Sequence, residues 1–548
     1  MVNHPDALKK VKFDSLIEGL EYAAQTDKGW RFYDIDGALL HKASYAQAKE
    51  LAVILAKKIA SFGWPRSSRI GLLAHQDPSF LIAFFACQYA GLLPCPLPPG
   101  TQVGGEEAYV SHLASLMQNA KLTALIGPEI FREIMLKAET LSITGCPNIL
   151  SYEELNELSP KGDLAPFGKD DLAYIQYSSG STAIPKGVVV SQHAVTSNIA
   201  LTLRDGLNAR ATDRTVSWLP FSHTMGLGGH VLASICGIST VDYLSPQILA
   251  RKPSTWIKLL SEKKAQTSFA PSFAWGLAAN IPDPGQYDLS HMRIAGIGGD
   301  TIQLTELDAF YSAFRDSGFK RNCFLPCYGM TETVLAITFH THGKDLVTHS
   351  LHPKGRPIVS VGKVLPGIDL IIVDDDGKEL PEKHIGYIWV RAPDLMTSYF
   401  DDKETTEASF RRDGFRDTGD MGYRIDGELI ITGRSKEMIL YRGRNIWPQD
   451  IEQIIEKKFS VHALAAFSVN EEASEKVVVL IETSEPDKER QSQLVQNASA
   501  SLRTGLGVSS EIVLITPGSL PYTSSGKLAR AEARDYYIKN LQEKYEKE

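Results

Sequence analysis

The sequence predicts an α/β protein: a large N-terminal domain of doubly wound sheets with a β-rich subdomain, and a small α+β C-terminal domain. Three observations support this. Short apolar runs alternate with helical segments up to about residue 300. Strands separated by Asp-Gly turns follow from about Gly362. A polar boundary near Arg434–Glu437 precedes a further set of strands and helices. We therefore expect domains at residues 1–434 and 435–548.

The N-terminal elements begin with a helix predicted over Tyr45–Phe62, where Leu51, Leu55 and Ile59 share one face and Ser44 can cap the first turn. The following segments predict a strand, a helix and a strand, which is the βαβ pattern of a parallel sheet. They are Ser68–Leu73, Pro78–Gly91 and Leu92–Leu97. Further strands of the same pattern are predicted at Ala124–Ile126, Ala173–Gln176, Thr215–Trp218, Thr240–Leu244, Gln266–Ala270 and Arg293–Gly296.

The later elements differ in character. Asp376-Gly377 and Asp426-Gly427 are turn signals typical of antiparallel strands. The strands around them are predicted at Leu370–Asp375, Tyr387–Arg391 and Glu428–Thr432. The C-terminal domain is predicted to contain a hairpin, a helix and two strands, at Met438–Asn445, Pro448–Lys458, Val477–Ile481 and Ile512–Ile515. The mixed-charge tail Ala531–Glu548 predicts a solvated helix.

Composition excludes several classes of protein. The 548 residues are 43% hydrophobic and carry a net charge of −8, which argues against disorder and against a general attraction to nucleic acid. The most apolar stretch, Phe80–Leu97, is interrupted by Gly91, Pro94 and Pro96 and falls short of the ~20 apolar residues of a membrane span. No apolar signal core begins the chain, so we expect a cytoplasmic protein. The six cysteines form no C-x-x-C pair, which disfavours zinc.

The strongest chemical signal is the loop YSSGSTAIPKG over Tyr177–Gly187, directly after a predicted strand. Small residues let backbone N–H groups approach a phosphate, hydroxyls donate hydrogen bonds and lysine neutralises charge. The order Pro-Lys-Gly before Val188–Val190 differs from a Walker A loop, in which Gly-Lys-Ser/Thr opens a helix. Composition alone leaves an ordinary Ser/Gly loop as the alternative. The candidate phosphate ligands are Ser178, Ser179, Gly180, Ser181, Thr182 and Lys186.

Further motifs follow the loop in a fixed order. They are SWLPFSHTMG (Ser217–Gly226), YGMTET (Tyr328–Thr333), DTGD (Asp417–Asp420), GRSKEMILYRGRNIWPQDIE (Gly433–Glu452) and PYTSSGKLAR (Pro521–Arg530). Together with the loop they resemble the ordered motifs of the adenylate-forming superfamily, which includes acyl-CoA synthetases, luciferases, peptide-synthetase adenylation domains and fatty acyl-AMP ligases. The resemblance covers nearly the whole chain. It implies an ATP-dependent acid ligase that uses Mg²⁺ and has a mobile C-terminal domain.

The implied reaction joins a carboxylate to the α-phosphate of ATP. Because both reactants are anions, the catalyst must supply positive charge and in-line positioning more than acid–base chemistry. The resemblance implies that Lys527 is catalytic, that Glu332 binds Mg²⁺ and that Thr331 reaches the α-phosphate. It places His223 beside the acyl and thiol sites and makes Lys436 the hinge between the domains.

The same resemblance assigns the nucleotide contacts. Thr182 and Lys186 are expected at the β- and γ-phosphates, Tyr328 at the adenine ring, and Asp420 with Arg434 at the ribose. The expected ATP/AMP-binding set also includes Gly299, Asp300 and Gly329. Taken singly, each residue has a structural alternative, since an Asp in Thr-Gly-Asp usually forms a turn and a lone histidine is usually structural.

Within the superfamily, the segments FFACQYAGLLPCPLPP, SFAPSFAWGLA and RGRNIWPQDIE resemble fatty acyl-AMP ligases. That family passes the acyl group to the phosphopantetheine thiol of an acyl carrier protein. Two departures are visible. Thr224 follows His223 where those ligases usually have an acid, and only 34 positions separate Tyr328 from Gly362, where they carry a longer insertion that hinders use of CoA. We expect a fatty-acid substrate and a carrier-protein acceptor, with an acyl- or aryl-CoA ligase as the alternative.

Three further predictions concern the acyl channel and two alternative classes of protein. Candidates for the acyl channel, which could equally be ordinary core, are Phe273, Trp275, Met225, Gly228 and Gly229. A non-catalytic nucleotide- or acyl-binding protein is disfavoured, because Lys527 and Glu332 are both present. A structural module of a larger synthase fits poorly, because no carrier domain follows Arg530.

Overall fold

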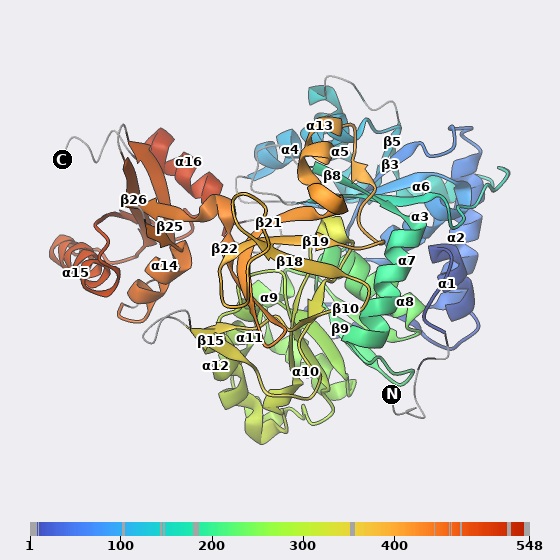
Figure 1. The fold of residues 1–548 in the computed structure, drawn as a ribbon. Helices are drawn as coiled ribbons and strands as arrows, with labels where there is room; N and C mark the ends of the chain where they lie inside the picture. The colour runs from blue at the N-terminus through green and yellow to red at the C-terminus, as the bar shows by residue number, and fades with distance from the viewer. Residues whose placement is uncertain are drawn as a thin grey trace.

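The computed structural model describes residues 8, 10–100, 105–142, 145, 148–178, 186–350, 357–442, 444–459, 461, 463–471, 474–522 and 528–541. They form a large N-terminal part, with a smaller C-terminal unit lying to one side of it (Figure 1). Separate hydrophobic clusters fill the two parts. The predicted architecture is therefore confirmed, whereas the mobility of the C-terminal unit stays a prediction.

The largest sheet among the described strands has nine strands, in the order β17-β14-β13-β12-β11-β9-β10-β1-β2. Its centre is parallel, and antiparallel strands close both ends. The strands are β1 (Gly29–Tyr33), β2 (Leu39–Ser44), β9 (Arg214–Ser217), β10 (Thr240–Leu244), β11 (Thr267–Ala270), β12 (Ile294–Ile297), β13 (Phe324–Tyr328), β14 (Thr338–Phe339) and β17 (Lys363–Val364). Its helices include α9 (Ile248–Arg251), α10 (Ser254–Glu262), α11 (Ser272–Ala279) and α12 (Leu304–Phe314).

A second parallel sheet has the order β4-β3-β5-β6. Its strands are β3 (Arg69–Leu73), β4 (Leu93–Leu97), β5 (Ala124–Gly127) and β6 (Ile149–Ser151). Helix α3 (Pro78–Ala90) connects β3 to β4, which confirms the predicted βαβ unit. Gly91 ends α3 with a φ of 68°, a left-handed conformation that favours glycine. Other helices here are α1 (Leu16–Ala23), α4 (Gly105–Ala120), α5 (Arg132–Leu141) and α6 (Tyr152–Glu157).

Helix α2 (Tyr45–Ala60) confirms the first predicted helix, and Ser44 forms a capping box with Gln47. The predicted apolar face is only partly correct. Leu55 is buried but Leu51 is 45% exposed, while Lys58 is buried and donates a hydrogen bond to the Asn156 carbonyl at 2.7 Å. Helix α3 packs along α2, and this contact decides which side of α2 is covered.

The predicted parallel strand at Ala173–Gln176 is wrong in its pairing. Strand β7 (Leu172–Ser178) runs antiparallel to β8 (Lys186–Ser191), and β20 (Ser398–Tyr399) completes this small sheet. The apolar run Val188–Val190 pairs with Tyr174–Gln176 of β7 in antiparallel register. Residues 179–185, which separate β7 from β8 in the sequence, lie outside the described residues.

The β-rich subdomain contains an antiparallel sheet in the order β18-β19-β21-β22. Its strands are β18 (Asp369–Val373), β19 (Gly386–Arg391), β21 (Arg416–Ile425) and β22 (Glu428–Arg434). Strand β21 was not predicted, because its sequence RDTGDMGYRI lacks the alternation of apolar and polar residues typical of a strand. Beside this sheet lie β15 (Thr348–Ser350), β16 (Pro357–Val359) and the short helix α13 (Lys403–Ser409).

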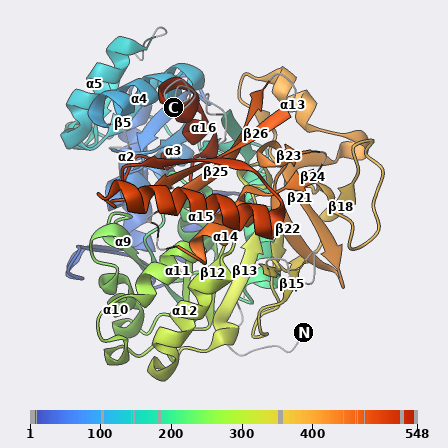
Figure 2. The same ribbon diagram turned by 90° about the vertical axis from the view of Figure 1, so that its left-hand side faces the viewer.

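The C-terminal unit has a sheet in the order β25-β26-β27, and Figure 2 views this unit from the front with α15 crossing it. Its elements are β23 (Ile439–Tyr441), β24 (Arg444–Ile446), α14 (Pro448–Glu456), β25 (Ala463–Glu471), β26 (Ser474–Glu482), α15 (Lys488–Leu506), β27 (Ser510–Ile515) and α16 (Arg530–Asn540). The prediction of a solvated helix is only partly correct for α16, because most of its side chains are exposed or half-exposed but two are buried. Ala533 and Tyr537, four residues apart, lie on one face of the helix and are fully buried against the sheet.

Between the sheets run α7 (Gln192–Leu201) and α8 (Ala233–Cys236), with a stretch of π-helix over Met225–Leu232 leading into α8. No helix within the described ranges has both the length and the apolar character needed to cross a membrane.

Candidate active site

The tightest polar cluster of the predicted site joins Tyr328, Asp420 and Arg434. The hydroxyl of Tyr328, at the end of β13, donates to Asp420 Oδ2 at 2.5 Å. Asp420 and Arg434 face each other in the register of β21 and β22, and Arg434 Nε lies 2.9 Å from Asp420 Oδ1. Burial and the Asp420 carboxylate raise the pKa of Tyr328 well above its usual value, so the phenol keeps its proton.

The DTGD segment lies inside strand β21, so the alternative of an isolated turn is wrong. Gly419 has a φ of 75°, and Asp417 and Thr418 use their side chains to accept hydrogen bonds from the N–H groups of Gly419 and Asp420. The Asp420 carboxylate, which follows the left-handed Gly419, accepts the hydrogen bond from Tyr328. Asp420 is only 5% exposed. A nearly buried carboxylate is thereby held in one orientation.

Thr331 and Glu332 lie on a single 3₁₀ turn, Thr331–Thr333, directly after β13. The next residue, Val334, has a φ of 68° and a ψ of −50°, and Leu335 N–H donates to the Thr333 carbonyl at 2.8 Å. This is a strained γ-turn at a β-branched residue, and the strained conformation costs on the order of 1–3 kcal/mol. Strain of this kind persists only where the surroundings hold the backbone firmly, and one such contact is the hydrogen bond from Met396 N–H to the Glu332 carbonyl at 2.8 Å.

The histidine motif meets the 3₁₀ turn through Thr224, whose hydroxyl lies 2.8 Å from that of Thr331. Nδ1 of the neighbouring His223 accepts a hydrogen bond from Met225 N–H at 3.3 Å, which orients the ring. The hydroxyl at position 224 therefore has a defined contact within the site, and the acid usual in fatty acyl-AMP ligases is replaced by a neutral partner.

Two predicted glycines are required by close packing or by backbone conformation. A Cβ on Gly329 would lie 1.7 Å from the Leu335 carbonyl oxygen, and Gly299 has a φ of 85°. The neighbouring Asp300 is exposed and accepts a hydrogen bond from Thr301 N–H at 2.7 Å. Burial raises the pKa of Glu437, and the charges of Glu452 and Asp300 raise it further. Asp300 therefore lies near the C-terminal unit.

The phosphate-loop prediction is only partly visible in the structure. Ser178 ends β7 and pairs in register with Lys186, which begins β8. The ammonium group of Lys186 lies 5.1 Å from the centre of the Tyr399 ring. The rest of the predicted loop lies outside the described residues, namely Ser179, Gly180, Ser181 and Thr182. The predicted catalytic residue Lys527 lies outside them as well.

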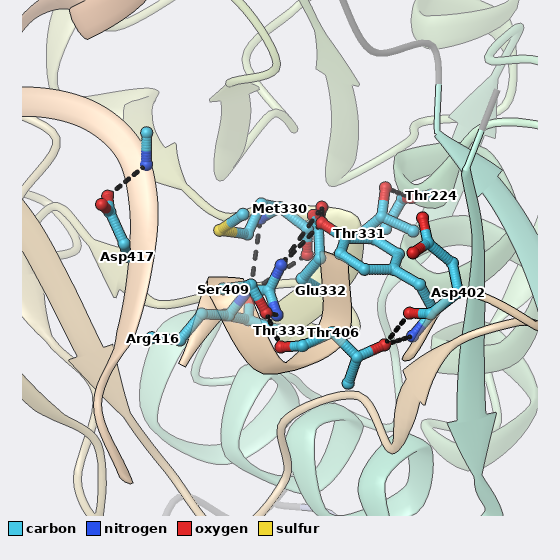
Figure 3. A network of polar contacts seen from close by, with 12 residues as sticks. Thr224, Met330, Thr331, Glu332, Thr333, Asp402, Thr406, Ser409, Arg416 and Asp417 are labelled. Atoms are coloured by element: carbon cyan, nitrogen blue, oxygen red, sulfur yellow. Dashed lines mark hydrogen bonds and ion pairs between the residues drawn. The ribbon is translucent and has the colours of Figure 1, made fainter. Parts of the chain in front are cut away.

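Sequence reasoning missed two residues that contact Glu332. The Tyr399 hydroxyl donates to Glu332 Oε1 at 2.7 Å. Arg416 Nη2 lies 3.7 Å from the same oxygen, and Figure 3 shows Arg416 beside Glu332. For Arg416 the available signal was its position two residues before Thr418 of the DTGD motif. No sequence signal distinguishes Tyr399.

The predicted acyl channel is partly wrong. Trp275 is fully buried, its indole N–H donates to the Gly296 carbonyl at 3.3 Å, and it packs on Trp256 and Phe310 as ordinary core. Met225 and Phe273 are only partly buried and stay candidates.

Arg530 links the C-terminal unit to the segment entering it. Its guanidinium lies 3.2 Å from Glu437 Oε2 and 2.6 Å from Glu452 Oε2, and its side chain is 13% exposed. Glu452 also accepts a hydrogen bond from Ala466 N–H of β25 at 2.9 Å. The segment before Lys436 is held differently, because the Ser435 hydroxyl donates to the Gly419 carbonyl of β21 at 3.0 Å.

Replacing Arg530 with methionine is expected to destabilise the C-terminal unit by about 3 kcal/mol, because two carboxylates would stay buried without their cation. Burial already raises the pKa of Glu437, so the deficit should shrink as the pH falls and that group protonates in the folded state. Hydrogen exchange of the β25–β27 amides measures the effect. The control is Arg534→Met, an exposed arginine on the same helix, which should change little.

Comparisons with known proteins match nearly the whole chain. The sequence model described as "AMP-binding enzyme" matches residues 21–400, and that described as "AMP-binding enzyme C-terminal domain" matches residues 443–532. A relative in Caulobacter vibrioides, named "Putative acyl-CoA synthetase", is 37% identical over 96% of both chains. A medium-chain-fatty-acid–[acyl-carrier-protein] ligase of Moorena producens is 27% identical over 98% of both.

Among solved structures, one from work on fatty acyl-adenylate ligases of E. coli and L. pneumophila superposes with a TM-score of 0.92. It is 34% identical, and the match covers 98% of this chain and 100% of the other. The likeness therefore includes both the N-terminal part and the C-terminal unit.

Proposed function

Because the chain belongs to the AMP-binding enzyme family, whose members are ATP-using, adenylate-forming ligases, we propose that it activates a fatty acid. The carboxylate oxygen of the acid attacks the α-phosphorus of ATP, the bond from that phosphorus to the bridging oxygen of the β-phosphate breaks, and acyl-adenylate and pyrophosphate form. The observation that carries the proposal is the cluster in which Tyr328, Asp420 and Arg434, from separate motifs, meet beside Thr331 and Glu332.

In this reaction Asp420 accepts hydrogen bonds from the ribose hydroxyls, which suits a carboxylate whose orientation is already held by Tyr328 and Arg434. Thr331 donates to the α-phosphate, and Gly299, Asp300 and Gly329 flank the adenine. Ser178 to Thr182 and Lys186 hold the β- and γ-phosphates. His223 lies beside the carboxylate of the acid.

Glu332 is the residue that would hold Mg²⁺, which neutralises the polyphosphate when bound. A carboxylate is a hard oxygen ligand, as this ion requires. The described residues contain no group of three His, Cys, Asp or Glu side chains arranged for a metal ion. One carboxylate together with nucleotide phosphates is a common way for proteins to bind this ion.

We place the hinge at Lys436. Ser435 is tied to Gly419 in the N-terminal part, whereas Glu437 is tied to Arg530 in the C-terminal unit. A rotation that preserves both contacts must act on the backbone between them. After adenylation, such a rotation would withdraw Lys527 and open the site to a thiol.

For the second step we propose transfer to the phosphopantetheine thiol of an acyl carrier protein. The likeness to the Moorena producens ligase over nearly the whole of both chains supports a carrier, whereas the Caulobacter vibrioides relative supports CoA as the alternative. The test starts with exchange of labelled pyrophosphate into ATP in the presence of Mg²⁺ and a panel of fatty and aryl acids. Absence of exchange with every acid would contradict the proposed activation step.

The acceptor is decided by competition. The enzyme, its preformed acyl-adenylate, CoA and holo-carrier protein are incubated together at equal acceptor concentrations, and the products are identified by mass. Acylated carrier as the main product supports the proposal. Acyl-CoA as the main product would replace it with the acyl-CoA ligase alternative.

A further inference from the structure

A buried arginine lies behind the proposed magnesium ligand. Arg416, the first residue of β21, is 1% exposed. Its Nη2 donates to the Tyr399 hydroxyl at 2.6 Å and its Nη1 donates to Ser409 Oγ at 2.9 Å. A buried charge is costly unless it is paired, and the carboxylate paired with Arg416 is that of Glu332, at 3.7 Å. The buried charge of Arg416 is therefore balanced by Glu332.

Tyr399 connects the two charges. Its hydroxyl accepts from Arg416 and donates its own proton to Glu332 Oε1 at 2.7 Å, so the direction of each hydrogen bond is defined. Hydrogen bonds arranged in such a chain strengthen one another in a medium of low dielectric constant.

Both contacts to the Glu332 side chain fall on the same oxygen, Oε1. The Glu332 backbone is held as well, since its carbonyl accepts from Met396 N–H at 2.8 Å. Figure 3 shows Glu332 lying between the Thr331–Thr333 turn and the Arg416 side chain. With Oε1 engaged by Tyr399 and Arg416, the rotation of the Glu332 carboxylate is restrained.

Helix α13 braces both partners of Glu332. Thr406 Oγ1 accepts from Tyr399 N–H at 2.9 Å, and Ser409 accepts from Arg416. Tyr399 also belongs to β20, which pairs with β8 just after Lys186. The network thus ties Glu332 to the strand that leaves the phosphate-loop segment, as well as to the strand that carries Asp420.

We propose that Arg416 and Tyr399 are positioning residues that orient the Glu332 carboxylate for the Mg²⁺ of the bound nucleotide. The inference rests on the proposed function, in which Glu332 holds that ion. It goes beyond that function by assigning the orientation of the metal ligand to two residues outside the expected ATP/AMP-binding set.

The test measures ATP binding by calorimetry without fatty acid, over a Mg²⁺ series and in EDTA. In the wild type, Mg²⁺ should tighten ATP binding. Tyr399→Phe removes only a hydroxyl and Arg416→Met removes the charge, and each should reduce the Mg²⁺-dependent gain about 10-fold. ATP affinity in EDTA should not change, and Arg416→Lys should recover part of the gain. Arg412→Met, an exposed arginine four residues earlier, is the matched control.

Circular dichroism establishes whether each variant folds. If Arg416→Met does not fold, the result with Tyr399→Phe decides the test. Variants that fold and keep the wild-type response to Mg²⁺ would overturn the inference alone. If the ATP affinity of the wild-type protein does not change with Mg²⁺, that result would contradict the proposed function, and the inference that rests on it would also be wrong.

Discussion

Replacing Lys527 with alanine is expected to slow acyl-adenylate formation by about 10²-fold or more, equivalent to about 2.7 kcal/mol of transition-state stabilisation. The physical reason is charge. A carboxylate and a triphosphate must approach each other, and a cation between them lowers the barrier most where negative charge builds up. Single-turnover formation of the acyl-adenylate, measured with saturating ATP and acid, checks this result.

The same variant should lose much less in the second half-reaction, when preformed acyl-adenylate and acceptor are supplied. By then the proposed rotation at Lys436 has withdrawn Lys527 from the reacting atoms. Lys539→Ala, which removes an exposed lysine of α16, is the control and should retain both half-reactions. Equal loss in both half-reactions of Lys527→Ala would argue against the rotation.

Replacing Asp420 with alanine is expected to lower kcat/KM for ATP about 100-fold, because a charged acceptor of ribose hydrogen bonds is worth about 1.5–3 kcal/mol per bond. The variant also leaves the buried Tyr328 hydroxyl without its acceptor and Arg434 without its carboxylate. Unlike Lys527→Ala, it should impair both half-reactions, since the acyl-adenylate carries the same ribose. Steady-state kinetics with ATP and with preformed acyl-adenylate measure the two effects.

A matched control separates nucleotide binding from the loss of a Tyr–Asp hydrogen bond. Asp375 is exposed and accepts from the Tyr387 hydroxyl at 2.9 Å in the same subdomain. Asp375→Ala should therefore leave the kinetics with ATP unchanged. Asp420→Asn keeps an acceptor for Tyr328 and should lie between wild type and Asp420→Ala. Normal kinetics in Asp420→Ala would remove Asp420 from the proposed ribose site.

Local sequence patterns predicted the elements that depend on near neighbours. Ser44 before α2, Pro78 at the start of α3 and Gly91 at its end act within one or two turns of the chain. The same patterns failed for β21 and for the pairing of β7. Strand β21 is stabilised by neighbours on both sides in its sheet, and these neighbours compensate for a sequence without alternation.

The order of the motifs and the family resemblance could be read from the sequence alone, because they depend on residue identity and spacing along the chain. The domain boundary near Arg434–Glu437 stays a prediction. The two further residues that contact Glu332 became visible only in the fold. Tyr399 and Arg416 reach Glu332 from positions 67 residues and more away in the chain. Such contacts arise because β20 and β21 supply side chains to the Thr331–Thr333 turn that follows β13. A hydrophobic period of two or 3.6 residues does not indicate contacts between segments so far apart in the chain.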